Sequence, residues 1–477
     1  MILSSKPPLL ESTLSRYVRW QHSKLLSASI DQTQLAIADA PTNAQPFSFL
    51  VIGDTDAGTT STSTGSIAFA QAFANQLTQQ FGDSRFLLHT GDVTYPIGTF
   101  ENYLHGFLRP YRALLNQCPA SAAYKANSVV FNRPLLPVPG NHDYAVSGSL
   151  VRRQWRAILR SICDRIRQLT GLDLGHYGGA GGEAYATTFL DNLENLEPEQ
   201  LTHHLKHFYT TSTRSLSADQ ADSYSLTYQP EYFTRLPNRY YTFRYGGVDF
   251  FALDSNTWCR SNQSEGFDQQ QLDWLQSALL RSCQTSNTVG RILYLHHSPY
   301  TTEESRWQYS DTLWVRRHLR TVLDRVAEKL SRGEAKKNSD RVHPIVDLVI
   351  SGHAHCLEHL KTTDTVHADA YMDWIVCGGS GADVRRQRQN NAEILENIAF
   401  KGRASTKVVA QSQFYAGAHG HGSKKQCFHS FIRIDVQPQN AQKFSIQPFV
   451  ISNGSLGWQA KKLTPLKLGC FARSSVC

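Results

Sequence analysis

The sequence lacks the features that mark several large classes of protein. Its nine cysteines are scattered, without a CxxC pair or regular spacing, which favours reduced thiols over a disulfide framework. Charged residues make up 18% and hydrophobic residues 40% of the chain, and this balance excludes a disordered protein or a coiled coil. No apolar run approaches the ~20 residues that a membrane-spanning helix needs. We therefore expect a soluble globular protein without a membrane partner.

The N-terminus and the overall charge bear on location and partners. Lys6 and two prolines interrupt the first residues, where a signal peptide has an unbroken apolar stretch, so we expect a cytoplasmic protein. The net charge of +8 suits an anionic substrate, although the excess is small for 477 residues. Basic residues do not gather into a run of five or more. Nucleic acid is therefore a permitted but not a favoured partner, and the oligomeric state is left open.

Short apolar runs alternate with helical patterns along most of the chain. Each run has about four to six apolar residues and ends in Gly, Asn, Asp or His, which is typical of strands buried on both faces. The runs are PFSFLVIGD (46–54), RFLLHTGD (85–92), RPLLPVPGNHD (133–143), VDFFALDSNTW (248–258), RILYLHHSPY (291–300), VDLVISGHAH (346–355) and DWIVCGGSG (373–381). Helical patterns cover 65–81, 267–280 and 311–332. This alternation predicts an α/β fold with polar residues at the carboxyl ends of the strands.

Two segments depart from this rhythm. Residues 1–46 are polar and only weakly periodic, and we interpret them as a peripheral helical arm. Residues 47–477 are expected to form one domain, in which about 145–240 are an insertion that opens with an Arg-rich helix and continues through a Gly-rich loop. Near the C-terminus, FIRIDV and KFSIQPFVI predict the closing strands of a second sheet.

Five segments that follow predicted strands hold an unusual density of metal-ligand side chains. They are Asp54 in GDTDAG, Asp92 and Tyr95 in GDVTY, Asn141 and His142 in GNHD, His296 and His297 in LHHSPY, and His353 and His355 in GHAH. Carboxylate, imidazole and amide donors together suit Fe, Mn or Zn. Each motif alone is typical of a turn, but all five after strands favour a metal site.

The five motifs resemble the ordered motifs of the calcineurin-like metallophosphoesterases, over residues 48 to about 381. The Tyr of GDVTY is similar to the tyrosinate ligand of the purple acid phosphatase branch. The resemblance implies a four-layer αββα sandwich of two mixed β-sheets flanked by helices. It also implies two metal ions, iron paired with iron, manganese or zinc.

The resemblance assigns a role to each motif residue. One ion would be bound by Asp54, Asp92, Tyr95 and His355, and the other by Asp92, Asn141, His296 and His353, with Asp92 as the bridge. A bridging carboxylate can hold ions ~3.5–4 Å apart, where they clamp the attacking and leaving oxygens of an in-line displacement. A metal-bound water would be the nucleophile. Asp92 and His142 are the expected catalytic residues, and His142 would donate to a phosphate oxygen or protonate the leaving group.

Three of these positions have alternatives. Asp56 is an added ligand, an acid beside the ligands or an exposed loop residue, and we favour either of the last two over the ligand. His296 is the first residue after its strand and our choice of ligand, with His297 facing substrate, although His297 fits an H-x-P spacing. Tyr95 is either a ligand or an aromatic residue that packs on the next strand. The helical spacing of His203, His204 and His207 favours a helix surface over an accessory metal face.

The sequence therefore predicts a metal-dependent phosphoesterase that hydrolyses a small phosphomonoester. A phosphodiesterase or nucleotide hydrolase is the alternative, because loops around the site set the substrate and the fold does not. A protein phosphatase is less favoured. A non-catalytic nucleic-acid-binding or scaffold protein on a degenerate core is also less favoured, because every expected ligand position holds a competent residue.

Overall fold

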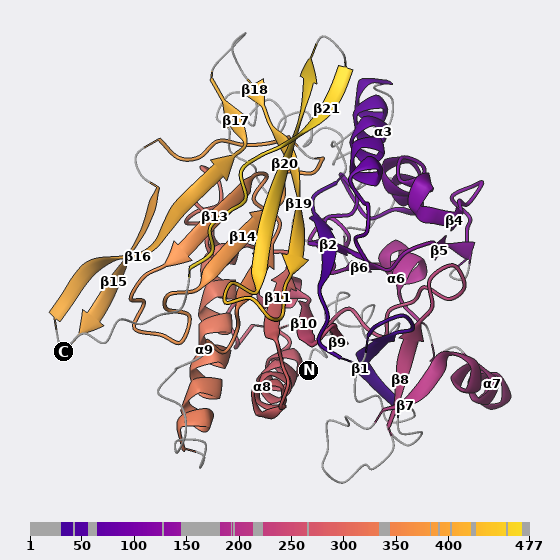
Figure 1. Cartoon of the computed structure of the whole chain (residues 1–477), viewed down its shortest axis with the longest axis horizontal. Helices are drawn as coiled ribbons and strands as arrows, with labels where there is room; N and C mark the ends of the chain where they lie inside the picture. Colours follow the sequence, from indigo (N-terminus) through magenta and orange to yellow (C-terminus); the bar gives the residue numbers. More distant parts are fainter. Residues whose placement is uncertain are drawn as a thin grey trace, which may run out of the picture.

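A computed structural model describes residues 30–41, 43–55, 64–125, 128–144, 182–191, 193, 196–212, 223–264, 267–332, 344–381, 383–389, 392–400, 403–420, 426–454 and 457–469. These residues form a mixed α/β fold in which two large mixed sheets are flanked by helices, as predicted (Figure 1). Asp56 and the predicted Arg-rich helix lie outside the described residues. None of the helices in these ranges combines the length and the apolar character that crossing a bilayer requires.

The larger sheet has 11 strands in the order β15-β16-β13-β14-β12-β11-β10-β9-β1-β8-β7. Its parallel centre consists of β10 (Val248–Leu253), β11 (Gly290–Leu295), β12 (Leu348–Ser351) and β14 (Asp373–Cys377). The other strands are β1 (Ile30–Ile37), β7 (Tyr209–Ser212), β8 (Ser223–Tyr228), β9 (Tyr241–Tyr245), β13 (Leu357–Thr362), β15 (Glu393–Phe400) and β16 (Arg403–Ala416).

The smaller sheet has six strands in the order β21-β20-β19-β2-β3-β6. In it β2 (Phe47–Ile52), β3 (Leu87–His89) and β6 (Leu135–Pro137) are parallel, and β19 (His429–Val436) pairs antiparallel with β2. The remaining strands are β20 (Phe444–Gly454) and β21 (Gly457–Lys462). Two short ribbons stand apart, β4 (Leu115–Gln117) with β5 (Val130–Phe131) and β17 (Ala418–His419) with β18 (Gln426–Cys427).

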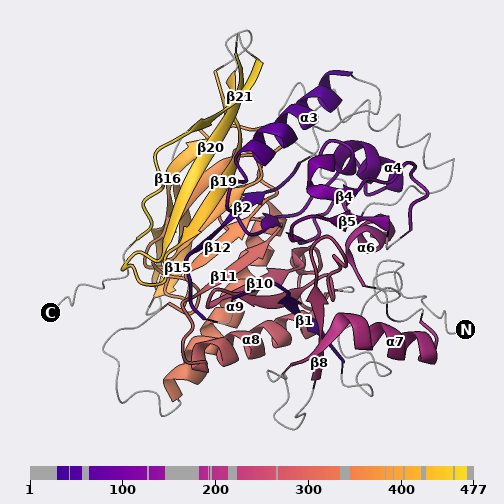
Figure 2. The same ribbon diagram turned by 45° about the vertical axis from the view of Figure 1, so that its right-hand side comes forward.

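The helices lie on the outer faces of the two sheets. The longer ones are α3 (Thr64–Gln79), α7 (Pro198–Phe208), α8 (Gln269–Gln284) and α9 (Ser310–Arg332). Short helical segments are α4 (Phe100–Asn102), η1 (Tyr103–Leu108), η2 (Arg112–Leu114), α6 (Glu183–Phe189) and η5 (Ser255–Trp258). Figure 2 shows α3 beside the smaller sheet. The helices α8 and α9 cover the face of the larger sheet that is turned away from the smaller one.

The central strands β10, β12 and β14 of the larger sheet are buried on both faces, as their continuous apolar runs predict. Phe250 and Ala252 of β10 face the core shared with the smaller sheet, and Phe251 and Leu253 face the core under α8 and α9. The same alternation holds along β11 and β12, because successive side chains of a strand point to opposite faces. The result is the helix–sheet–sheet–helix order of layers that the resemblance implies.

Aromatic rings fill the space between the two sheets. Phe49 of β2 and Phe86 beside β3 are stacked with ring centroids 4.9 Å apart. From the larger sheet, Phe243 and Phe250 stack at 4.6 Å. Phe250 meets Phe49 and Phe86 edge-on at 5.4 and 5.5 Å, an arrangement that the quadrupoles of aromatic rings favour. All four side chains are buried, so they bind the sheets into one core.

The strands and helices predicted from the motif-bearing runs are confirmed, but the prediction for residues 30–37 is wrong. They form β1, which lies between β8 and β9 in the larger sheet. The polar residues of this strand obscure its pattern in the sequence. Two of them satisfy one another locally, because Asp31 accepts hydrogen bonds from the Thr33 backbone N–H at 2.9 Å and the Thr33 hydroxyl at 2.6 Å. Likewise β7 and β8, within the predicted insertion, join the larger sheet. The division of the chain into an arm and a domain stays a prediction.

Glu396 joins the outer strand β15 to α9. Its carboxylate accepts hydrogen bonds from Arg316 and, at 2.7 Å, from Arg320. Burial opposes ionisation, but these two guanidinium groups hold the pKa of Glu396 below its usual value of 4.5. We expect Glu396→Gln to lower the free energy of unfolding by about 1–2 kcal/mol at pH 7. The midpoint of urea unfolding measures this change.

The pH dependence of that loss follows from the lowered pKa. A carboxyl whose pKa is lower in the folded state stabilises the protein above its unfolded pKa, and this contribution disappears as the pH falls through the folded value. The difference between wild type and Glu396→Gln should therefore shrink as the pH drops below 4.5. Glu328→Gln, which removes an exposed pair with Arg332, is the control and should change stability by less than about 0.5 kcal/mol. A constant difference across this pH range would contradict the assignment.

Candidate metal centre

The predicted ligands stand directly after strands of both sheets. Because the carboxyl ends of parallel strands meet at one edge of a sheet, short turns there bring distant residues together. The smaller sheet contributes Asp54 after β2, Asp92 and Tyr95 after β3, and Asn141 after β6, and the larger sheet contributes His296 after β11 and His353 and His355 after β12. These are called the seven candidate ligands below, and all but Asn141 are buried.

One half of the centre consists of Asp54, Tyr95 and His355. The Tyr95 hydroxyl donates to Asp54 Oδ1 at 2.7 Å and lies 3.3 Å from His355 Nε2. His355 Nε2 lies 3.6 Å from the same Asp54 oxygen. The other ring nitrogen of His355, Nδ1, lies 3.0 Å from the carbonyl oxygen of Asp383, which fixes the ring. Three donor atoms therefore face one point.

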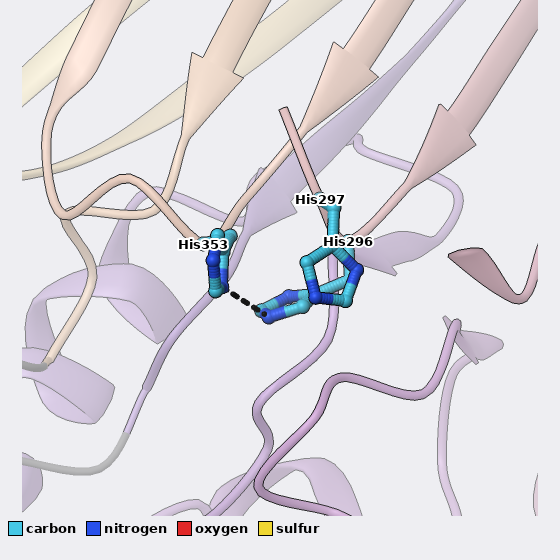
Figure 3. A group of neighbouring side chains, drawn as sticks. All are labelled: His296, His297 and His353. Carbon is cyan, nitrogen blue, oxygen red and sulfur yellow. Dashed lines mark hydrogen bonds between the residues drawn. The ribbon is translucent and has the colours of Figure 1, made fainter. Parts of the chain in front are cut away.

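The other half consists of Asp92, Asn141, His296 and His353. His296 Nε2 lies 3.4 Å from Asp92 Oδ2, 3.1 Å from Asn141 Oδ1 and 3.1 Å from His353 Nδ1. Figure 3 shows the His296 and His353 rings facing one another across that last contact, with His297 alongside. His296 Nδ1 is held by the Thr90 carbonyl oxygen at 2.9 Å.

The two halves adjoin at the aspartates. Asp54, Asp92 and His296 each place one ligand atom within 4.8 Å of the others. The backbone N–H of His353 also donates to Asp54 Oδ2 at 2.9 Å, which ties the turn of the larger sheet to the turn of the smaller one. Asp92 therefore lies where a ligand shared between two ions would have to lie.

The backbone at the candidate ligands is unusual. Asp54, Asp92 and His353 have positive φ angles of 56°, 51° and 66°. This left-handed conformation is uncommon for residues other than glycine, and it clusters at functional sites. At Gly140 a Cβ atom would lie 2.1 Å from Asp92 Oδ1, so only glycine allows the GNHD turn to approach this carboxylate.

The electrostatics of the site fit metal cations. Burial, with the nearby charge of Asp92, raises the pKa of Asp54 to about 7, although His296 opposes the rise. Burial would also raise the pKa of Asp92, but His296 and His142 hold it well below its usual value. Burial disfavours a charged His296, yet the Asp92 carboxylate raises its pKa to about 9. Buried carboxylates that need positive charge, beside imidazole and amide donors, form a donor set suited to iron, manganese or zinc.

His142 stands at the edge of the centre. Its backbone N–H donates to Asp92 Oδ1 at 2.8 Å, and its ring Nδ1 lies 2.8 Å from the carbonyl oxygen of Pro96. Its side chain is 17% exposed, whereas Asp92 is 1% exposed. The free Nε2 edge of a partly exposed ring is well placed to meet a substrate atom arriving from solvent.

The structure separates His296 from His297. His296 faces Asp92 and Asn141, whereas His297 Nδ1 lies 2.8 Å from the hydroxyl of Ser255. The choice of His296 stays a prediction, because His296, His297 and His353 also place one ligand atom each within 4.8 Å of one another. The ring centroid of His297 lies 4.4 Å from that of His353.

Two residues that support the site had no role in the sequence analysis. The Asp143 carboxylate accepts hydrogen bonds from Gly140 N at 2.8 Å, Val93 N at 3.1 Å and the Tyr103 hydroxyl at 2.6 Å. It therefore clamps the GNHD turn to the GDVTY turn. Asp143 belongs to a motif and was detectable, but Tyr103 lies in a segment without any pattern that marks it.

Comparison with known proteins bears on the family. The model of the calcineurin-like phosphoesterase family matches residues 47–357, which is more than half of the chain. The chain belongs to this family. This match confirms the resemblance at the level of the family. A comparison with curated protein sequences found no match.

Similar solved structures include three proteins with different descriptions. Purple acid phosphatase PPD1 from yellow lupin (Lupinus luteus) seeds is 13% identical at a TM-score of 0.45, over 89% of this chain and 55% of that one. GAP50, described as the anchor in the inner membrane complex of Plasmodium, is 14% identical at 0.42, over 90% of each chain. PhoD is 11% identical at 0.39, over 90% of this chain and 74% of that one. This chain thus spans about half of the lupin phosphatase (55%), and such distant likeness assigns neither substrate nor metal.

Proposed function

We propose that the chain hydrolyses small phosphomonoesters at a dinuclear metal centre held by the seven candidate ligands. Asp54, Tyr95 and His355 would hold one ion, and Asn141, His296 and His353 the other, with Asp92 between them. The observation that carries this proposal is the convergence of these side chains from five separate turns. Plain turns have no reason to bring two buried carboxylates within reach of three histidines.

The chain's own residues would divide the work as follows. The ions, when bound, supply Lewis-acid polarisation of a phosphoryl oxygen and activation of water for attack. Asp92 keeps the two halves of the centre in register through its contacts with His296 and the His142 backbone. His142 donates a proton to the leaving-group oxygen or a hydrogen bond to a phosphoryl oxygen. The site opens at His142, whose side chain is more exposed than the carboxylates.

Tyr95 supports the purple acid phosphatase branch and an iron ion in the Asp54 half. Burial, with the charges of Asp54 and Asp92, raises the pKa of Tyr95 well above its ordinary value. Without metal the phenol is therefore neutral and donates to Asp54. A strongly Lewis-acidic ion would displace that proton, and a tyrosinate bound to ferric iron is coloured. We propose iron there and iron, manganese or zinc in the other half.

The test combines metal content, colour and turnover. The full chain, loaded with iron and zinc or iron and manganese, should contain about two ions by elemental analysis. It should also absorb visible light and hydrolyse p-nitrophenyl phosphate faster than bis(p-nitrophenyl) phosphate. Tyr95→Phe should lose the colour. Tyr124→Phe, which removes another buried phenol that contacts Thr188, is the matched control and should keep it.

Each other outcome changes a different part of the proposal. Two ions without colour would make Tyr95 a packing residue and remove the branch assignment. Faster turnover of the diester would replace the substrate class. Failure to take up metal, or turnover of neither ester, would overturn the proposed activity and favour a binding protein on this fold.

A further inference from the structure

A second group of metal-ligand side chains lies beside the candidate centre, and the proposed function does not use it. Cys259 follows η5, His297 follows β11, and Asp311 is in the first turn of α9. Each offers one ligand atom, and these atoms lie within 4.8 Å of one another. His297 and Asp311 are buried and Cys259 is half-buried. Three elements that are separate in sequence therefore present sulfur, nitrogen and oxygen donors to one point.

The His297 ring is oriented toward this group. Its Nδ1 lies 2.8 Å from the Ser255 hydroxyl, and its backbone N–H donates to the same oxygen at 3.0 Å. Nε2 is the nitrogen left for Cys259 and Asp311. Metal-binding histidines are typically held in this way, with one nitrogen on a neighbouring polar group and the other on the ion.

His353 adds an unsatisfied polar atom at the same place. Its Nδ1 faces His296 at 3.1 Å. Its Nε2 is buried, has no hydrogen-bond partner among the described residues, and lies 4.0 Å from Asp311 Oδ2. Buried polar atoms without partners are rare in folded proteins and require an explanation. A cation between Asp311 and His353 would supply one.

A Cys–His–Asp arrangement can also act as a nucleophile, but this one is poorly suited to it. The thiolate is the reactive form of cysteine. Burial, together with the charges of Asp311 and Asp254, raises the pKa of Cys259 well above its ordinary value, and the thiol donates to the Ser255 carbonyl at 3.3 Å. A free thiol here is therefore protonated and unreactive. A bound metal ion would remove that proton.

The charge of the surroundings also admits a cation. Arg306 is buried, and its positive charge acts on both His297 and His353. That charge would oppose a bare ion. A Cys259 thiolate and the Asp311 carboxylate offset the two charges of a divalent ion, so Arg306 would face a neutral complex.

We propose that Cys259, His297 and Asp311 form a third metal site, with His353 Nε2 as a fourth donor. One thiolate, one imidazole, one carboxylate and the His353 ring are ligand types of four-coordinate zinc, and the thiolate selects against hard cations such as magnesium. When His353 also binds an ion of the proposed centre through Nδ1, its ring would give up the remaining N–H proton to solvent and bridge as an imidazolate, with its charge shared between the two ions. An ion there would fix the rings of His297 and His353 from the side opposite the Asp92 half.

Cobalt titration of the metal-free full chain tests this site, because thiolate-bound Co²⁺ has a charge-transfer band in the near ultraviolet. Wild type should show the band, and Cys259→Ser should lose it and bind one ion fewer by elemental analysis. Cys283→Ser, which removes another half-buried thiol, is the matched control and should keep both. Asp311→Asn preserves the side-chain shape and should weaken binding at this site by about 10- to 100-fold.

The same titration in Asp92→Asn separates this site from the proposed centre. A band that persists when the Asp92 half no longer binds metal would establish the third site on its own. No band in wild type, with equal ion counts in wild type and Cys259→Ser, would overturn it and leave the proposed phosphoesterase centre untouched. Circular dichroism of Cys259→Ser and Asp311→Asn shows whether either result reflects misfolding.

Discussion

Asp92→Asn is expected to lower kcat/KM for a phosphomonoester by about 1,000-fold or more, which corresponds to roughly 4 kcal/mol of transition-state stabilisation. Asp92 is buried, contacts His296 Nε2 at 3.4 Å and accepts the His142 backbone N–H at 2.8 Å. If two ions share this carboxylate, its replacement by a neutral amide removes a negative charge that acts on both ions. Metal content should therefore fall together with turnover.

Asparagine is the replacement that isolates this charge. It has the shape of aspartate, and it tolerates the positive φ of 51° that residue 92 adopts. Asp273→Asn, on the exposed face of α8, is the control and should leave both metal content and rate unchanged. Circular dichroism and thermal unfolding verify that each variant is folded. An Asp92→Asn protein that kept about two ions and full activity would refute the bridging role.

His142→Ala is expected to lower kcat by about 100- to 10,000-fold while metal content is retained. No candidate ligand bonds the His142 ring, since Nδ1 lies against the Pro96 carbonyl and Nε2 is 4.0 Å from Asp92 Oδ2. The variant thus removes a proton donor and leaves the metal ligands in place.

The leaving group distinguishes the two roles proposed for His142. A general acid matters most when the leaving alcohol is poor, so the loss should be larger for an alkyl phosphate than for p-nitrophenyl phosphate. An equal loss on both esters would assign His142 to a phosphoryl oxygen instead. His105→Ala, which removes an exposed histidine that contacts Arg109, is the control for the loss of an imidazole. A rate unchanged by His142→Ala would exclude both roles.

The sequence indicates which side chains gather at one place in the fold because strand ends carry the candidate ligands. Asp54, Asn141 and His353 each follow an apolar run, and parallel strands bring such ends to one edge whatever the lengths of the connections. Their mutual distances are not predictable in this way, because those depend on how the two sheets pack. The choice between His296 and His297 likewise needs side-chain directions that two adjacent histidines do not reveal.

The features missed by sequence reasoning depend on contacts between distant segments. The sequence of β1 is polar and does not read as a strand, but Asp31 and Thr33 satisfy one another by local hydrogen bonds. Tyr103 reaches Asp143 from η1, a segment with no motif. Cys259 and Asp311 meet only because η5 and α9 pack on the same face of the larger sheet. Of the three histidines expected on a helix surface, His203 and His207 lie exposed on α7, with their ring centroids 4.1 Å apart. The third, His204, is half-buried, with Nε2 2.9 Å from Asp191 Oδ2.

The aromatic core between the sheets affects the distances between the candidate ligands. Asp54 and Asp92 belong to turns of the smaller sheet, and His296 and His353 to turns of the larger one. The distance between the donors of the two sheets therefore depends on the thickness of the stack of phenylalanine rings between them. Close-packed interiors transmit displacement instead of absorbing it, and small shifts of reacting groups are costly to catalysis. The phenylalanine rings set the spacing between the two sheets. A change of ring size there would therefore alter the distances between the candidate ligands without changing any ligand.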